Sequence, residues 1–410
     1  MRLLVLFIIF TLSSTGSFAK RGKKKLSLEE KRWNDINRLI NEEIHTIKLA
    51  RKASDKIMYR LFELKSEKLK LIKEKENKVF MAKKLKYGKK IKRKNSFTKT
   101  LRSYNETNAY GLSILKKYKN TRYKAAIYYT LALNSRDFAY DKNELKFLRL
   151  ALKFSHGQQK VNYLARTSLA EYYYNNKKWK AAIYQYELVK GNQDDEWYTK
   201  DLLNYGWCLL KDHKFAKAIN SLEKSYKLSA DEYYVDVREQ AMTGLISFYV
   251  LGKQIDRGIK FIDKYSTTKN ESHLKLAQKA SGKGHFKESE QIISLLESRI
   301  DAKKEVELYA DFRLFQFDVY KQYHKPKKLI KIAKLFPMIS FNNYQREDAI
   351  RKLSDIVGPK QIILKKDFSK HDQTFDRTVL NEIITYFDLL ALIDKTEKAQ
   401  YDYLSLIHIS

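Results

Sequence analysis

The chain has 410 residues, of which 43% are hydrophobic and 32% are charged, and its net charge is +34. This composition excludes a disordered chain and a multi-span membrane protein, and the length suffices for several domains or one elongated repeat array. Only 13 glycines and three prolines occur, and every proline lies after residue 325. Because proline breaks helix interiors, and because β folds and nucleotide-binding folds use much glycine, the sequence predicts an all-α fold.

The N-terminus has the pattern of a signal peptide. An apolar run from Leu3 to Leu12 follows Met1 and Arg2, and a small-residue stretch then ends at Ala19. We therefore expect residues 1–19 to be cleaved and the mature protein to be periplasmic or secreted. An uncleaved anchor is the alternative, but the run falls short of the roughly 20 residues that cross a bilayer. No later segment is as long and free of charge, so we expect no transmembrane span.

The region 20–100 is expected to form a long coiled-coil helix. Residues 23–87 contain neither glycine nor proline, and nine of twelve heptad a and d positions between Trp33 and Leu71 are apolar. The three exceptions are candidates for setting register or partner: Glu43, Ser54 and Lys68. This seam favours an oligomeric or hairpin coiled coil. One helix of a monomeric bundle is the alternative.

The same region is strongly basic, with 28 Lys or Arg against 10 Asp or Glu between residues 20 and 99. Two runs form the candidate basic contact region: Lys23, Lys24 and Lys25, and then Lys89, Lys90, Lys92, Arg93 and Lys94. For an exported protein the expected partners are anionic envelope polymers, lipid head groups or acidic proteins, and nucleic acid is unlikely. AT-rich codon usage is the alternative explanation of lysine excess outside the N-terminal third.

Two segments in the middle of the chain repeat at an interval of 36 residues. Each has a small residue in its first helix, an aromatic residue at the turn and an alanine early in its second helix: Ala170, Trp179 and Ala182, then Gly206, Phe215 and Ala218. These residues resemble the tetratricopeptide repeat (TPR), in which small side chains lie where antiparallel helices cross. Weaker copies flank them, from about residue 104 to 335.

Amphipathic segments over 336–410 predict a helical cap, whose abrupt end suggests truncation or a cloning remnant. The resemblance implies an α-solenoid of helical hairpins over 101–335. It also implies a groove that is lined by the first helix of each hairpin and holds a protein segment. Six residues match groove positions of the two best copies: Glu171, Tyr174, Asn175, Lys200, Trp207 and Lys211. The alternative is that these residues are solvated or serve packing.

The sequence lacks a recognisable catalytic constellation. Eight histidines are scattered without an HExxH motif, and Gly282-Lys283-Gly284 lacks the remaining residues of a phosphate-binding loop. Asp194-Asp195-Glu196 fits a helix start better than a metal site. The single cysteine, Cys208, lies in an apolar stretch and is expected in the core. We therefore predict no enzyme activity, no cofactor and no metal.

A signal peptide, a coiled coil and TPR-like repeats in this order are similar to bacterial periplasmic coordinators of cell division or envelope assembly, and to repeat proteins of gliding-motility machinery. This likeness implies a non-enzymatic scaffold that binds envelope proteins, and itself through the coiled coil. The alternative is a polyanion-binding protein whose basic N-terminal helix grips an anionic glycan, a lipid head group or nucleic acid.

Overall fold

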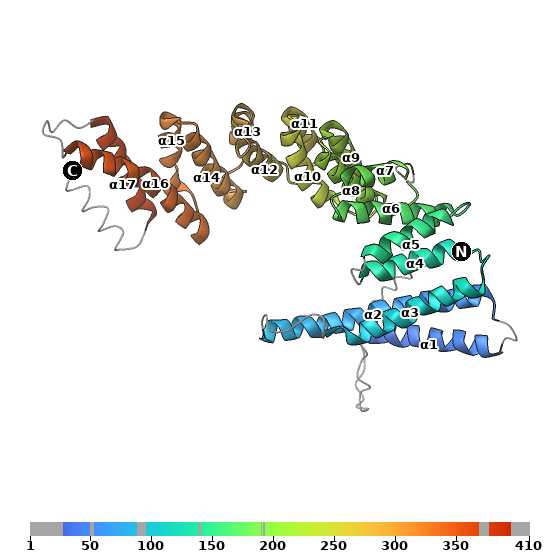
Figure 1. The fold of residues 1–410 in the computed structure, drawn as a ribbon. Coiled ribbons are helices and arrows are strands. Elements are labelled where there is room, and N and C mark those ends of the chain that lie inside the picture. Colours follow the sequence, from blue (N-terminus) through green and yellow to red (C-terminus); the bar gives the residue numbers. More distant parts are fainter. Residues whose placement is uncertain are drawn as a thin grey trace, which may run out of the picture. The chain divides into compact units, whose positions relative to one another are not determined.

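The computed structural model describes residues 28–49, 53–87, 96–137, 141–189, 191, 193–368 and 377–394. These residues form helices and connecting turns without any strand, so the predicted all-α fold is confirmed for them (Figure 1). The chain divides into two compact units, Met1–Tyr172 and Tyr173–Ser410. The predicted signal peptide lies outside the described residues. The predicted limits of the coiled coil, the repeat array and the cap stay predictions.

The N-terminal unit contains α1 (Leu28–Leu49), α2 (Asp55–Tyr87), α3 (Thr98–Lys117), α4 (Lys124–Asp137), α5 (Asp141–Lys153) and most of α6 (Gln159–Asn175). The C-terminal unit contains α7 (Trp179–Glu187), α8 (Tyr198–Lys211), α9 (Phe215–Leu228), α10 (Arg238–Leu251), α11 (Ile255–Tyr265), α12 (Lys269–Ser281), α13 (Phe286–Arg299), α14 (Val306–Gln322), α15 (Pro326–Ala333), α16 (Asn343–Phe368) and α17 (Arg377–Ile393). A short 3-10 helix, η3 (Phe336–Met338), follows α15.

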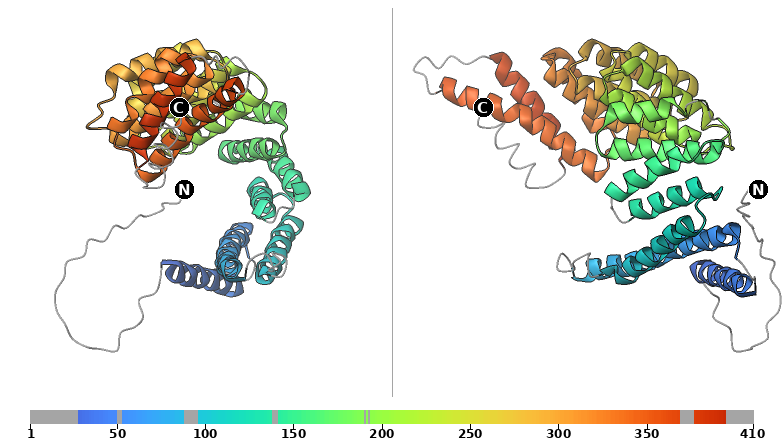
Figure 2. Two further views of the ribbon diagram at one scale, coloured as in Figure 1. Left: turned by 90° about the vertical axis from the view of Figure 1, so that its left-hand side faces the viewer. Right: turned by 45° about the vertical axis from the view of Figure 1, so that its right-hand side comes forward.

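The segment expected as one long helix is instead two helices, α1 and α2, which lie side by side (Figures 1 and 2). Ser54 begins the second helix, because its Oγ accepts a hydrogen bond from the Ile57 backbone N–H at 3.3 Å, as an N-cap does. Ser54 therefore caps a helix instead of interrupting a heptad seam. This break between the two helices uses neither glycine nor proline.

The apolar residues of the predicted heptad seam are nevertheless the ones that pack between α1 and α2. One buried cluster joins α1 to α2, with Trp33 and Ile47 packed against it: Ile36, Ile40, Leu61, Leu64 and Leu71. Lys68, an exception in the seam, places its Nζ 5.3 Å from the centre of the Trp33 ring, which is a cation–π contact. The seam is thus covered within the chain by the packing of α1 on α2, with Tyr110 of α3 packed against the same cluster.

The C-terminal unit is an array of helical hairpins whose turns share one backbone design (Figure 1). Two residues before α7, α9, α11, α13 and α15, the backbone is left-handed: Lys177 (φ 57°), His213 (φ 60°), Lys253 (φ 52°), Gly284 (φ 77°) and His324 (φ 52°). The next residue donates its N–H to the carbonyl five positions earlier, as Lys214 does to Leu209 at 2.8 Å. This arrangement is the Schellman motif, which satisfies the last carbonyls of the first helix.

Small residues allow the hairpins to pack closely. Ala182 and Ala218 are fully buried, and Leu222 lies between Gly206 of its own hairpin and Gly244 of the next. A Cβ atom built at Gly206 would lie 2.0 Å from a Leu222 methyl, and one at Gly244 would lie 2.7 Å from the other methyl. The glycines are therefore required by the close approach of neighbouring helices. These contacts give the packing that the two best sequence copies predict.

Polar contacts join each hairpin to the next at about one repeat length. Arg257 bonds Glu223 at 2.8 Å, Arg299 bonds Asp263 at 2.5 Å, and Lys352 bonds Asp318 at 2.5 Å. The partners are 34 to 36 residues apart in sequence. Such nearest-neighbour contacts are the way in which repeat arrays gain stability, since each unit touches only those beside it.

Candidate partner-binding surface

Of the six predicted groove residues, Glu171 lies in the N-terminal unit. Its Oε2 is 3.0 Å from a guanidinium nitrogen of Arg136, and the same Arg136 bonds Glu144 at 2.8 Å. Only 6% of the Glu144 side chain is exposed, whereas Arg136 and Glu171 are each about one-third exposed. In this structure Glu171 links α6 to α4 and α5.

The other five predicted residues lie on α6 and α8. The Tyr174 ring meets Trp179 edge-on at 5.3 Å, and the Trp207 ring meets Phe248 edge-on at 4.9 Å, so both rings pack against neighbouring helices. The remaining three side chains are exposed: Asn175, Lys200 and Lys211. Burial is the main cause that raises the pKa of Tyr174, which agrees with its packing role. Partner binding by these residues stays a prediction.

A polar furrow runs along the first helices of three successive hairpins. Its first hollow, about 530 Å³, lies between α10 and α12, and its second, about 680 Å³, lies between α12 and α14. The two hollows share Thr267, Thr268 and Glu271, which makes them one continuous surface. We call this surface the furrow. Grooves along the first helices are where TPR arrays hold partner segments, as the resemblance implies.

The furrow is acidic although the whole chain is basic. Its lining contains three cations, Arg238, Lys269 and Lys275, and six carboxylates: Asp236, Glu239, Glu271, Glu305, Glu307 and Asp311. Arg238 pairs with Asp236 at 2.7 Å, and Lys275 pairs with Glu271 at 2.6 Å. Two of the three cations are thus already paired, which leaves an excess of negative charge.

Three of these carboxylates occupy the same place in their helices. Glu239, Glu271 and Glu307 lie in the first turns of α10, α12 and α14. An acidic residue there stabilises the positive end of the helix dipole, so each has a structural role as well. None of the three is among the groove residues predicted from the sequence, although their recurrence at intervals of 32 and 36 residues is a signal in the sequence.

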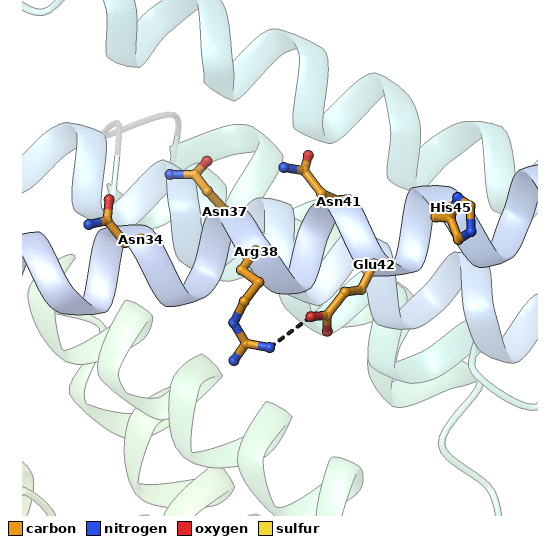
Figure 3. A pocket seen from close by; sticks show the side chains of 6 residues that line it. All are labelled: Asn34, Asn37, Arg38, Asn41, Glu42 and His45. Carbon is orange, nitrogen blue, oxygen red and sulfur yellow. Dashed lines mark hydrogen bonds and ion pairs between the residues drawn. The ribbon is translucent and has the colours of Figure 1, made fainter.

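A second polar surface lies on α1, opposite the side chains that α1 buries (Figure 3). A hollow of about 550 Å³ is lined by Asn34, Asn37, Arg38, Asn41, Glu42 and His45. Arg38 and Glu42 pair at 2.7 Å, and the Asn37 side chain donates to the Trp33 carbonyl. This face offers amide and charged groups to a partner, but nothing in it resembles a catalytic site.

The described residues contain no group of three or more potential metal ligands, and none of their helices is long and apolar enough to cross a membrane. Cys208 is buried, as the sequence predicts, and burial raises the pKa of its thiol to about 12. Such a thiol stays protonated and unreactive near neutral pH. The predicted absence of enzyme activity stays a prediction.

The basic contact region lies outside the described residues. This applies to every member of it: Lys23, Lys24, Lys25, Lys89, Lys90, Lys92, Arg93 and Lys94. Their proposed role in contacting anionic partners therefore rests on the sequence alone.

A scan against protein-family models and a search of the curated proteins find no match. Among solved structures, a putative kinesin light chain of Podospora anserina with TPR-like repeats is 13% identical over 45% of this chain and 99% of that chain, with a TM-score of 0.34. A TPR protein of Parabacteroides merdae is 15% identical over 66% and 98% of the two chains, also with a TM-score of 0.34. PilF of Pseudomonas aeruginosa is 16% identical over 55% and 97%, with a TM-score of 0.31.

The predicted TPR-like fold is confirmed by the hairpins of the chain itself. They combine buried small residues at the helix crossings, a shared turn geometry and contacts between neighbours at about one repeat length. The chain is thus similar to TPR proteins in architecture. At this level of identity the likeness concerns the fold alone.

Proposed function

We propose that the protein is a non-enzymatic scaffold that binds another protein through the furrow between α10, α12 and α14. The single observation that carries this proposal is the continuous acidic hollow along three first helices in a chain of net charge +34. The carboxylates of Glu239 and Glu307, which make no ion pair with a described residue, suit a partner segment rich in ammonium, guanidinium or amide groups.

The scaffold is proposed to act in the cell envelope after export, as a periplasmic or secreted protein. This part of the proposal is supported by the signal-peptide pattern of residues 1–19 and by the architectural likeness to envelope repeat proteins. Immunoblotting of cell fractions from a strain that expresses the full chain tests it. Recovery of an uncleaved protein from the cytoplasm would contradict it.

The partner proposal is tested by charge reversal in the furrow. We expect Glu239→Lys with Glu307→Lys to abolish the specific capture of a partner from envelope extracts by the full-length protein. The matched control is Glu232→Lys with Glu347→Lys, which makes the same change in net charge at exposed residues outside the furrow. Equal capture by both variants, quantified by mass spectrometry, would show that the furrow does not hold the partner.

The alternative function is polyanion binding by the basic N-terminal region. This function is supported by the excess of 28 cations over 10 carboxylates between residues 20 and 99. Replacing Lys23, Lys24 and Lys25 by Gln leaves the helices α1 and α2 intact, because these residues precede them. If this variant loses partner capture, and if capture by the native chain is lost at high salt, the alternative replaces the scaffold proposal.

A further inference from the structure

The five left-handed turns of the C-terminal unit line up along one edge of the hairpin array. Two pairs of neighbouring turns touch: a Cβ atom built at Gly252 lies 3.2 Å from the Cβ atom of Phe215, and the rings of Phe286 and Tyr323 have centroids 3.5 Å apart. We call the residues within four positions of each left-handed residue the turn edge. The loops that join one hairpin to the next lie on the other edge, where the Val235 N–H donates to the Glu196 carbonyl at 2.8 Å.

The two edges carry opposite charge. The turn edge has 14 Lys or Arg and 3 Asp or Glu, a net charge of +11, whereas residues 173–410 as a whole have 40 and 33, a net charge of +7. The joining loops, 188–197, 229–237, 266–268, 300–305 and 334–342, have 4 and 8, a net charge of −4. Codon bias toward lysine would enrich both edges alike. The segregation therefore calls for a different explanation.

Cations of the turn edge are free to bind a ligand. Every turn has an exposed lysine that makes no ion pair with a described residue: Lys178, Lys217, Lys253, Lys283 and Lys327. Others are engaged, since Lys214 pairs with Asp212 and Lys328 pairs with Glu290. An unpaired ammonium in each of five consecutive turns gives a row of charges that repeats with the hairpins.

The chemistry of the row indicates the kind of partner. Thirteen of its 14 cations are lysines, and the one arginine, Arg257, already bonds Glu223 and Asn220. Lysine is a hydrated point charge, while specific recognition of nucleic acid favours arginine forks and exposed rings for base stacking. The aromatic residues of the turns are only partly exposed and pack on neighbours, as Trp179 does on Tyr174.

We propose that the turn edge binds a flexible linear polymer with repeating carboxylate or phosphate groups, which follows the edge from turn to turn. A row of charges matches such a chain better than it matches the plane of a membrane. This surface is separate from the furrow, which is acidic. Binding there would let the array lie along an anionic polymer while the furrow stays available to a protein.

Lysine footprinting of the full-length protein tests the location. We expect polygalacturonate, polyphosphate or both to slow acetylation of Lys178, Lys217, Lys283 and Lys327 several-fold, read by mass spectrometry. Four exposed lysines outside the turn edge serve as internal controls and should acetylate at unchanged rates: Lys260, Lys303, Lys304 and Lys334. The two polymers separate carboxylate from phosphate recognition. Uniform protection of all eight lysines, or none, overturns the proposal.

Charge neutralisation tests the energetics. Replacing Lys178, Lys217, Lys283 and Lys327 by Gln should weaken polymer binding about tenfold or more at low salt and reduce the slope of log affinity against log salt by about 3. Replacing Lys260, Lys303, Lys304 and Lys334 by Gln changes the net charge equally and should weaken binding less than about twofold. Equal losses overturn the proposal. So does a turn-edge variant that loses binding to phosphatidylglycerol vesicles or duplex DNA but keeps polymer binding.

Discussion

At the scale of single residues, the hairpin turns show where the chain accepts unfavourable backbone geometry. Five positions adopt a positive φ in equivalent turns, yet only Gly284 is a glycine, while the others are lysine or histidine. For a residue with a Cβ atom, the left-handed conformation costs roughly 1 kcal/mol or more of conformational free energy. The turns are therefore held by the packing of the helices and not by turn residues.

Replacing a turn residue by glycine should consequently stabilise the array. We expect His324→Gly to raise the free energy of unfolding by about 1 kcal/mol, because glycine adopts the observed φ of 52° without a steric penalty. Urea unfolding followed by circular dichroism measures this. The control is Gly284→Ala, at φ 77°, which should lower stability by a similar amount. Destabilisation by His324→Gly would show that this turn is not left-handed.

Close helix packing predicts the opposite outcome for glycine at a crossing. We expect Gly206→Ala to lower the free energy of unfolding by about 1–2 kcal/mol, since its Cβ would meet Leu222, and this overpacking outweighs the better helix propensity of alanine. Gly191→Ala, in the loop between α7 and α8, is the control, because a Cβ there meets nothing within 4 Å and the backbone is not left-handed. That variant should gain about 0.5–1 kcal/mol in the same unfolding measurement. A gain at both positions would contradict the packing at Gly206.

At the scale of helices and hairpins, buried polar groups fix how one hairpin sits on the next. Glu223 of α9 accepts hydrogen bonds from the Tyr249 hydroxyl and the Arg257 guanidinium, each at 2.8 Å, and these donors belong to α10 and α11. Burial and the Glu223 carboxylate both raise the pKa of Tyr249, so its hydroxyl remains a donor at all physiological pH. This carboxylate thus joins two hairpins.

Removing the Glu223 carboxylate should lower the free energy of unfolding more than removing an exposed carboxylate does. We expect Glu223→Ala to lower the free energy of unfolding by about 2 kcal/mol, less than for a fully buried pair because 38% of the Arg257 side chain is exposed. A double-mutant cycle with Arg257→Ala should give a coupling of about 1 kcal/mol. The exposed pair of Figure 3 is the control, and Glu42→Ala should change stability by less than about 0.5 kcal/mol. If Glu223→Ala and Glu42→Ala change the free energy of unfolding equally, Glu223 does not connect the two hairpins.

Acid sensitivity is expected at His273, whose side chain is fully buried on α12. Burial is the main cause that lowers its pKa below 6.5, although Asp263, 3.6 Å from its Nε2, acts in the opposite direction. The unfolded chain then binds a proton near pH 6.5 that the folded chain does not, so this residue contributes stability above pH 6.5 that is lost on acidification. Asp263 acts in the same sense at lower pH, because its bond to Arg299 lowers its pKa.

The test compares the native chain with His273→Gln between pH 7.5 and 5.5. We expect the native chain to lose more unfolding free energy over this range than the variant does, and the difference isolates His273 from the other histidines. Should the native chain instead gain stability relative to the variant on acidification, the pKa of His273 is raised and the ion pair with Asp263 dominates.

Helix type, and the packing role of several residues, could be predicted from the sequence. Ala170, Ala182, Gly206 and Ala218 are buried where the TPR resemblance implies, and Cys208 is a core residue. The absence of glycine and proline from residues 23–87 could not reveal that α2 starts after Ser54. The cap is a serine, and whether a serine caps a helix depends on the local backbone. The positions of the turns could be predicted from the sequence, but their left-handed backbone could not. Lysine and histidine at these positions do not indicate a positive φ.

The furrow could be predicted least. Its carboxylates come from three hairpins and from the loops before them, so they are brought together only when the hairpins stack. Only two copies of the repeat are clear in the sequence, so the predicted groove residues lie on α6 and α8. The recurrence of Glu239, Glu271 and Glu307 in first turns would have directed attention to the later hairpins.

At the scale of the whole molecule, charge is divided between the units and within one of them. Residues 1–172 hold 42 Lys or Arg and 15 Asp or Glu, a net charge of +27, and residues 173–410 hold the remaining +7. The C-terminal unit sets an acidic furrow and acidic loops apart from a basic turn edge. This division allows one array to hold two partners of opposite charge.

All of this depends on neighbouring hairpins being stacked in register, and an engineered disulfide tests that stacking directly. In the full-length protein, Phe215→Cys and Gly252→Cys place two Cβ atoms about 3.2 Å apart, which a small adjustment brings to the spacing of a disulfide. We predict that mild oxidation joins positions 215 and 252, as peptide mapping under non-reducing conditions will show, whereas Phe215→Cys with Lys283→Cys, two turns along the array, stays unlinked. Failure of the first pair to link, or equal linking of both pairs, would contradict the stacked array.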